Sequence, residues 1–242
     1  MTRQARQASP QAGFGLIELM IAMGLSLFML LGFSVVFVNM RQAFGAQNQL
    51  AQLQDNERFL LIALTTTIEN AGFFPDPVNS TAETALPATN ASGSSFSAGQ
   101  GLTGADGAAG GSDKVTVRYV SASGTGLLDC LGAANTSGHD LLMTNTFSIS
   151  ASNELLCSTD GGATTVALVG GVASMTALYS VDISGSGQTY QFLKASEVTA
   201  GDYWSRVKTV RITVAMLNPY AAQAGQAATL SWRQIINVMN KP

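Results

Sequence analysis

The chain is poor in the residues that most catalytic and metal sites need. Its 242 residues include one histidine, His139, and two cysteines, Cys130 and Cys157. Zinc sites usually take four Cys, His or carboxylate ligands at close, recognisable spacings. The glycine-rich run 101–111 lacks the Lys-Ser/Thr ending of a phosphate loop, and no nucleophile–base motif is evident. We therefore expect no bound metal, no cofactor and no enzymatic activity.

Charge is also scarce, and its balance is mildly acidic. Twelve basic and fifteen acidic residues give a formal net charge of −3. Domains that bind nucleic acid usually carry a clustered basic patch and a high isoelectric point. We therefore expect no nucleic-acid partner.

No proline lies between residues 11 and 74, so nothing in this stretch forces a helix to end. From Phe14 to Val38 there are 25 residues, and Glu18 is the only charged one. About 20 apolar residues are enough to span the hydrocarbon core of a bilayer as a helix. The apolar region of a cleaved secretory signal is shorter, roughly 7–15 residues. Residues 14–38 are therefore predicted to form a transmembrane helix.

The leader before this segment carries the basic residues Arg3 and Arg6. By the positive-inside rule they predict a cytoplasmic N-terminus in a single-pass inner-membrane protein. Apolar residues then continue at helical spacing through residues 39–72, which predicts an amphipathic periplasmic half of the same helix that packs on a folded domain. We therefore expect one helix from residue 14 to residue 71, with Gly72 placed to end it.

The remaining chain divides by composition into two parts. Residues 73–112 are rich in Gly, Ser and Ala, so we expect a variable surface excursion that buries little. From residue 113 to residue 242, alternating apolar residues predict a β-rich globular domain. Strands are expected at 114–120, 141–150, 154–157, 164–169, 172–182, 188–194, 207–216 and 228–239. The predicted fold class is α+β: a long N-terminal helix packed on an antiparallel β-sheet domain.

The residues at the start of the apolar run, from Gly13 to Met23, resemble the type III signal of type IV prepilins and pseudopilins. In that family a prepilin peptidase cuts after the glycine and N-methylates the new first residue. The resemblance implies cleavage between Gly13 and Phe14, and methylation of Phe14. An acid within hydrocarbon is costly unless it finds a partner, so Glu18 is a candidate for function. We expect it to pair with the new amine of Phe14 on an adjacent subunit and so to set the axial register of a filament.

Later passages resemble the PilW family of type IV minor pilins. They are residues 50–59, 68–73, 111–119, 129–132, 155–157 and 206–212. The resemblance implies a type IV pilin-like fold and a structural subunit that helps initiate pilus assembly at or near the filament tip, supporting adhesion and twitching motility. The implied partners are the prepilin peptidase, other minor pilins, the major pilin and a large tip adhesin. The protein is expected in the inner membrane before assembly and in the extracellular pilus afterwards.

Both cysteines fall in the part of the chain predicted to be translocated. Conditions there are oxidising, so a Cys130–Cys157 disulfide is the leading interpretation. It would close a loop of 26 intervening residues and stabilise the fold by about 3 kcal/mol. The passages around the two residues also resemble the two-cysteine loop of the PilW family.

Two other functions are compatible with these patterns. A minor pseudopilin of a type II secretion system would share the N-terminal signal. Alternatively, the β domain is a pilus-tip binding module for a sugar, a surface or DNA, with the polar segment 79–112 as the natural location of its site.

Overall fold

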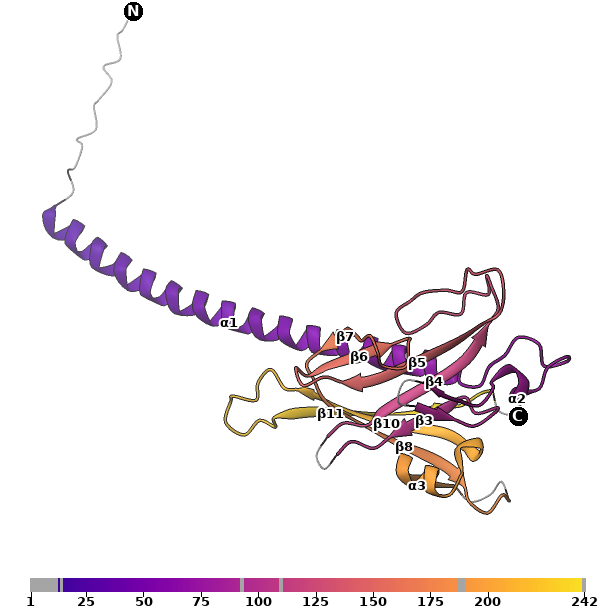
Figure 1. The fold of residues 1–242 in the computed structure, drawn as a ribbon. Helices are drawn as coiled ribbons and strands as arrows, with labels where there is room; N and C mark the ends of the chain where they lie inside the picture. The colour runs from indigo at the N-terminus through magenta and orange to yellow at the C-terminus, as the bar shows by residue number, and fades with distance from the viewer. Residues whose placement is uncertain (1–12, 14, 92–93, 109–110, 187–189, 241–242) are drawn as a thin grey trace, which may run out of the picture. The chain divides into compact units, whose positions relative to one another are not determined.

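The computed structural model of the protein describes residue 13 and residues 15–91, 94–108, 111–186 and 190–240 (Figure 1). The chain forms two compact units, residues 1–50 and residues 51–242. Helix α1, Leu16–Glu69, contributes to both units. Its bounds lie within two residues of the helix from 14 to 71 that the sequence predicts.

In the first unit, α1 exposes its large apolar side chains all round. From Leu16 to Phe44 these side chains are each more than half exposed. The helix is long and apolar enough to cross a membrane, with a mean hydropathy of 2.4 over its most apolar window. A helix that is apolar on every side needs lipid or other protein around it.

In the second unit, α1 buries one face in the folded domain. Leu53, Leu60, Leu64 and Ile68 are buried, which confirms that this half of the helix packs on the domain. Their spacing of seven and four residues keeps them on one side of the helix. Leu50 shares the apolar pattern but is 41% exposed, so burial begins one turn later than the pattern suggests.

The β-structure consists of two main antiparallel sheets and a short hairpin (Figure 1). The five-stranded sheet has the order β3-β4-β5-β6-β7, and the four-stranded sheet has the order β11-β10-β8-β9. The five-stranded sheet contains β3 (Leu102–Ala105), β4 (Lys114–Ser121), β5 (Leu141–Ile149), β6 (Glu154–Ser158) and β7 (Val166–Gly170). The four-stranded sheet contains β8 (Val172–Asp182), β9 (Tyr190–Leu193), β10 (Val207–Leu217) and β11 (Thr229–Asn237). One buried cluster includes residues of α1 and of both sheets. The predicted α+β arrangement is confirmed.

Six elements are absent from the sequence prediction. They are α2 (Ala82–Ala85), β1 (Thr89–Ala91), β2 (Ser94–Phe96), β3, α3 (Ala195–Ala200) and a 3₁₀ turn, Trp204–Arg206. Four of them lie in the segment 73–112, which buries more than its composition suggests. Leu86, Phe96 and Leu102 are each at most 4% exposed, and β3 pairs with β4. The expectation that this segment buries little is therefore wrong, because Leu86, Phe96 and Leu102 are placed inward, although Val78 is 89% exposed.

Gly72 ends the helical region as predicted, in a conformation that other residues adopt only with strain. Its φ is +79°, and its N–H donates to the Arg118 carbonyl at 3.0 Å. A Cβ atom built on Gly72 would lie 2.6 Å from the carbonyl oxygen of Asn240. The absence of a side chain at Gly72 therefore allows the left-handed turn. It also lets the segment after β11, which contains Asn240, pass close to the Gly72 backbone.

Replacing Gly72 with alanine is expected to lower the free energy of unfolding by about 1–3 kcal/mol. Gly124 provides a matched control, since its φ is also +79° but no atom lies within 4 Å of its Cβ position. Gly124→Ala measures the conformational cost alone. Urea unfolding of both variants should show a larger loss for Gly72→Ala, and equal losses would exclude the steric contribution of Asn240.

Candidate functional site

The predicted processing signal lies just before the start of α1. Gly13 and Gly15 are exposed, and no atom lies within 4 Å of a Cβ atom built on Gly13. Phe14, the expected first residue of the processed protein and the expected site of methylation, lies outside the described residues. Gly13 is thus in an open stretch of chain, which is what a peptidase requires of its substrate.

Glu18 occupies the first turn of α1. Its backbone N–H and that of Leu19 both donate to the carbonyl of Gly15, at 3.1 and 3.2 Å. An acid in a first helical turn interacts favourably with the positive end of the helix dipole. The Glu18 side chain is exposed, and within the described part of the chain it makes no hydrogen bond or ion pair. Its carboxylate is therefore available to a group on another molecule.

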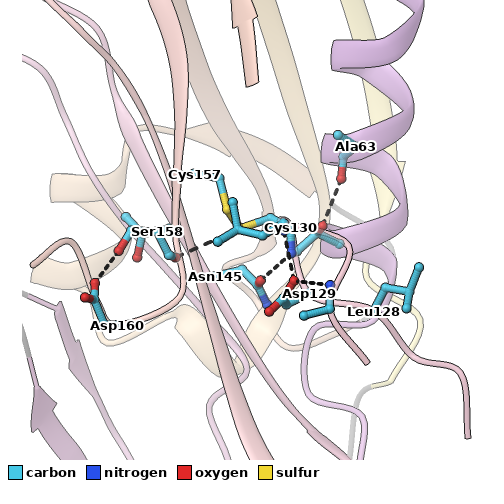
Figure 2. The surroundings of a disulfide bond; sticks show 12 residues. Ala63, Leu128, Asp129, Cys130, Asn145, Cys157, Ser158 and Asp160 are labelled. Atoms are coloured by element: carbon cyan, nitrogen blue, oxygen red, sulfur yellow. Dashed lines mark hydrogen bonds between the residues drawn. A yellow bond between two sulfur atoms is a disulfide. The ribbon is translucent and has the colours of Figure 1, made fainter. Parts of the chain in front are cut away.

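The two cysteines are joined by a disulfide, as the sequence predicts (Figure 2). Cys157 lies on β6 and is fully buried, whereas Cys130 lies in the loop between β4 and β5. Their Cα atoms are 6.1 Å apart. The backbone N–H of Cys130 donates to the side-chain oxygen of Asn145 on β5 at 2.7 Å. The hydrogen bond from Cys130 to Asn145 and the disulfide together hold this loop against the five-stranded sheet.

Side chains near Cys130 order the rest of this loop, residues 122–140. The Asp129 carboxylate accepts hydrogen bonds from the backbone N–H groups of Leu131 and Ala133, at 2.9 and 2.8 Å. The Tyr119 hydroxyl donates to the Leu128 carbonyl at 2.6 Å, and burial raises the pKa of Tyr119 to about 12. Tyr119 therefore remains a hydrogen-bond donor throughout the physiological pH range.

The lone histidine belongs to the same loop and has no catalytic surroundings. Its Nδ1 lies 3.1 Å from the carbonyl oxygen of Ser137, and the side chain is exposed. The nearby Asn135 is buried and donates to the carbonyls of Ser121 and His139, at 2.6 and 2.8 Å. No group of three His, Cys, Asp or Glu residues within the described ranges is arranged to hold a metal ion.

Removing the disulfide is expected to cost about 3 kcal/mol of stability, because the unfolded chain regains the freedom of the closed loop. The Cys130→Ser, Cys157→Ser double variant should unfold at lower urea concentration than the wild type. Adding reductant should shift the wild-type midpoint toward that of the variant and leave the variant unchanged. Equal midpoints for the oxidised wild type and the double variant would show that the disulfide contributes nothing to stability.

Arg118 on β4 was not singled out from the sequence, and it organises the segment before β3. The residue is fully buried although the strand pattern places it on the face expected to be solvated. Its guanidinium donates to four backbone carbonyls and lies 4.5 Å from the centre of the Phe96 ring. The four bonds join Nε to Gln100 (2.6 Å), Nη1 to Pro87 (2.6 Å), Nη2 to Ser97 (2.8 Å) and Nη2 to Leu86 (3.2 Å).

Burial lowers the pKa of Arg118 to about 10, which still leaves it charged at neutral pH. Buried charges are normally paired with an opposite charge. Here backbone carbonyls and an aromatic face take that role. A strand that is covered on both faces is usually apolar throughout, whereas a half-exposed strand alternates apolar and polar residues. The polar residue at position 118 makes β4 alternate, so the sequence indicated an exposed face and gave no signal that Arg118 is buried.

These features define a class of protein. A long apolar helix begins a few residues after Gly13, carries Glu18 as its only acid up to residue 54, and packs its second half on an antiparallel β domain. This combination is the architecture of a type IV pilin.

Comparison with known families agrees with this class. Residues 8–34, which include Gly13, Phe14 and Glu18, match the family model of the prokaryotic N-terminal methylation motif. Residues 133–235 match the family model described as Type IV Pilus-assembly protein W, PilW. Together the two matches support a type IV minor pilin of the PilW family. The second match begins after Cys130, so the earlier passages that resemble PilW proteins lie outside it.

Comparison with individual proteins adds little. No curated protein matches the chain. Among solved structures, the chain is similar to a type IV-like pilin from Thermus thermophilus, with a TM-score of 0.41 and 10% sequence identity. That similarity covers 78% of this chain and 96% of the other.

Proposed function

We propose that this protein is a non-enzymatic structural subunit that helps to initiate assembly of a type IV pilus and sits at or near the filament tip. There it would support adhesion and twitching motility. The observation that carries the proposal is Glu18, which has no partner among the described residues and lies in the first turn of an apolar helix, in a chain with a PilW domain. An acid in an apolar environment is costly unless a partner offsets its charge, and the cation of another subunit can do so.

We assign the following parts to successive segments of the chain. Residues 1–13 form the leader, residues 14–38 the transmembrane half of the helix, and residues 39–72 its periplasmic half. Residues 73–112 form the variable segment and residues 113–242 the globular pilin domain. Before assembly the protein is held in the inner membrane with its N-terminus in the cytoplasm, and after assembly it is part of the extracellular pilus.

Cleavage after Gly13 creates the cation that Glu18 needs. The new N-methylated amine of Phe14 is positively charged and lies only four residues from Glu18. When the helix moves from lipid into a bundle of pilin helices, a Glu18 carboxylate and the Phe14 amine of an adjacent subunit can pair. A subunit in the wrong axial position would leave both charges unmatched, which is costly in an apolar bundle. The pair therefore selects one register.

The proposed partners are the prepilin peptidase, other minor pilins, the major pilin and a large tip adhesin. The exposed apolar half of α1 supports contacts with other pilin helices, because such a surface needs either lipid or protein around it. The match to the PilW family model supports an association with other proteins of the pilus machinery.

Mass spectrometry of the protein's N-terminus tests this proposal. It would be done on membrane and sheared-filament fractions of the wild type and of a strain lacking the prepilin peptidase. We expect N-methyl-Phe14 in the filaments of the wild type only. An intact Met1 leader in both strains, confined to membranes, would overturn the proposal.

A deletion strain separates the pilus from a type II secretion system. We expect loss of twitching motility with normal protein secretion. Loss of secretion with normal twitching would instead identify the protein as a minor pseudopilin.

A further inference from the structure

A polar crevice runs beside β2, β3 and the 3₁₀ turn at Trp204. It consists of two adjoining cavities of about 260 and 280 Å³ that share Ser97, Gln100, Asp202 and Trp204. Pockets for small molecules commonly have volumes of about 300–1,000 Å³, so the two cavities together reach that range. The crevice lies wholly within the unit formed by residues 51–242.

Hydroxyl groups dominate the lining of the second cavity. They come from β2 and the residue after it, from β3, β4 and α3, and they belong to Ser94, Ser95, Ser97, Thr103, Thr116 and Thr199. Four of these hydroxyls already bond within the protein: Ser94 with Thr116, Ser95 with Asn90, Thr116 also with Thr146, and Thr199 with Ala195 and Trp204. A hydroxyl can donate one hydrogen bond and accept two, so these four keep acceptor capacity, whereas Ser97 and Thr103, whose hydroxyls make no bond within the described residues, can also donate. The Thr103 side chain makes no hydrogen bond within the described residues, although Thr103 is only 8% exposed.

Two opposite charges border the same cavity. They are Lys114 at the start of β4 and Asp202 after α3. Neither side chain makes a hydrogen bond or ion pair in the part of the chain that the structure describes. Both are therefore free to form charge-assisted hydrogen bonds, which are stronger than those between neutral groups.

Trp204 lines both cavities, and 8% of its surface is exposed. Its indole N–H donates to the Thr199 hydroxyl at 3.1 Å, and its ring meets that of Tyr179 edge-on at 4.8 Å between centroids. These contacts fix the orientation of the ring. A rigid aromatic wall beside hydroxyls provides both an apolar and a polar surface to one small ligand.

We propose that this crevice binds a neutral sugar ring. A sugar presents hydroxyls that match the Ser and Thr groups, and its C–H faces match the indole of Trp204. The crevice is lined by one lysine and two acids, Asp202 and Glu83, which does not suit a polyanion such as nucleic acid. The scarcity of large apolar side chains in the lining does not suit a lipid tail. Sugar binding would add recognition of a glycan surface to the structural role, and it does not depend on filament assembly.

Tryptophan fluorescence of the full chain tests the proposal. The chain has two tryptophans, and Trp232 lies on β11 outside the crevice. Trp232→Phe therefore leaves Trp204 as the only reporter. The protein would be held in a zwitterionic detergent, because the sugar headgroup of a maltoside would itself compete. The probes are glucose, galactose and N-acetylglucosamine, with glycine as the non-sugar comparison.

A saturable change in Trp204 fluorescence with at least one sugar, and none with glycine, is the expected result. In this background Asp202→Asn and Thr103→Val should each weaken binding by about fivefold or more, since each removes a direct partner. Asn is chosen at residue 202 because its φ of +52° is tolerated by Asn as well as by Asp. Asp140→Asn changes an exposed acid outside the crevice and should leave binding unchanged.

The opposite results overturn the proposal. They are no response to any of the three sugars at about 100 mM, a response to glycine alone, or affinities that neither crevice variant alters. Saturation-transfer NMR on the wild-type chain provides a measurement that needs no variant. Absence of transfer to all three sugars would also overturn it.

Discussion

Replacing Glu18 with valine is expected to reduce the amount of this protein in sheared filaments by about tenfold or more, while insertion and cleavage remain normal. Valine cannot pair with the Phe14 amine of a neighbouring subunit, so that cation would stay unmatched in an apolar bundle. Insertion should persist because removing an acid makes the helix more apolar. Immunoblots of membrane and sheared fractions measure the distribution, and the N-terminal mass reports cleavage.

Two further variants separate charge from other effects. Glu18→Asp keeps the carboxylate and should incorporate better than Glu18→Val. Asp55→Asn removes an exposed acid from the same helix, beyond the apolar run, and should incorporate normally. Normal amounts of Glu18→Val in filaments would show that this carboxylate has no role in assembly.

Replacing Arg118 with methionine is expected to lower the free energy of unfolding by about 2–5 kcal/mol. Leu86 and Ser97 keep a second hydrogen bond, because their carbonyls also accept the backbone N–H groups of Gly99 and Gln100. Within the described residues the carbonyls of Pro87 and Gln100 have no partner other than Arg118. Gln100 is buried, and a buried acceptor without a partner costs about 1–3 kcal/mol, whereas Pro87 is exposed and its carbonyl can turn to water. The loss of bonds to a charged donor adds to this cost. Urea unfolding of the oxidised protein measures the change.

The loss should be concentrated in the segment that Arg118 holds. Hydrogen exchange in residues 86–102 should accelerate more than in β8 or β10, which supply none of the carbonyls that Arg118 bonds. Arg233 offers a matched control because it is exposed on β11, and Arg233→Met should change stability by less than about 0.5 kcal/mol. Equal effects of the two substitutions would mean that the Arg118 network does not hold this segment.

If both predictions hold, the apolar helix and the globular domain each depend on a charged residue, but the partners of these residues come from different sources. Glu18 is unpaired within the described chain and is proposed to find its cation on another subunit. Arg118 is a cation whose partners are all supplied by its own chain. Substitution at residue 18 should therefore affect assembly, and substitution at residue 118 should affect folding.

Much of the architecture could be predicted because it follows from local patterns. The absence of proline between residues 11 and 74, together with helical apolar spacing, predicted α1 to within two residues at each end. Period-two alternation predicted each strand from β4 to β11, with ends that differ by a few residues. The Cys130–Cys157 disulfide followed from the predicted side of the membrane, and the structure confirms it.

The segment 73–112 shows where local patterns are not enough. Its composition indicates a loop, yet Phe96 is buried against Arg118 on the second face of β4, and Leu102, which pairs with Val117, joins the main core. The polar residue that makes this possible, Arg118, looks solvated when the strand is considered alone. Its environment is created by carbonyls 18 to 32 residues away in sequence, and no pattern within the strand contains them.

The sequence by itself determined the long apolar helix, the α+β class and the prepilin-type signal, because apolar length, periodicity and a short motif are properties of consecutive residues. Only the tertiary structure decided that β4 is covered on both faces, that Gly72 must accommodate the carbonyl of Asn240, and that Trp204 adjoins the hydroxyls of β2 and β3. Each of these depends on which distant segments meet. Burial and hydrogen bonding between such segments are fixed by the packing of the whole domain.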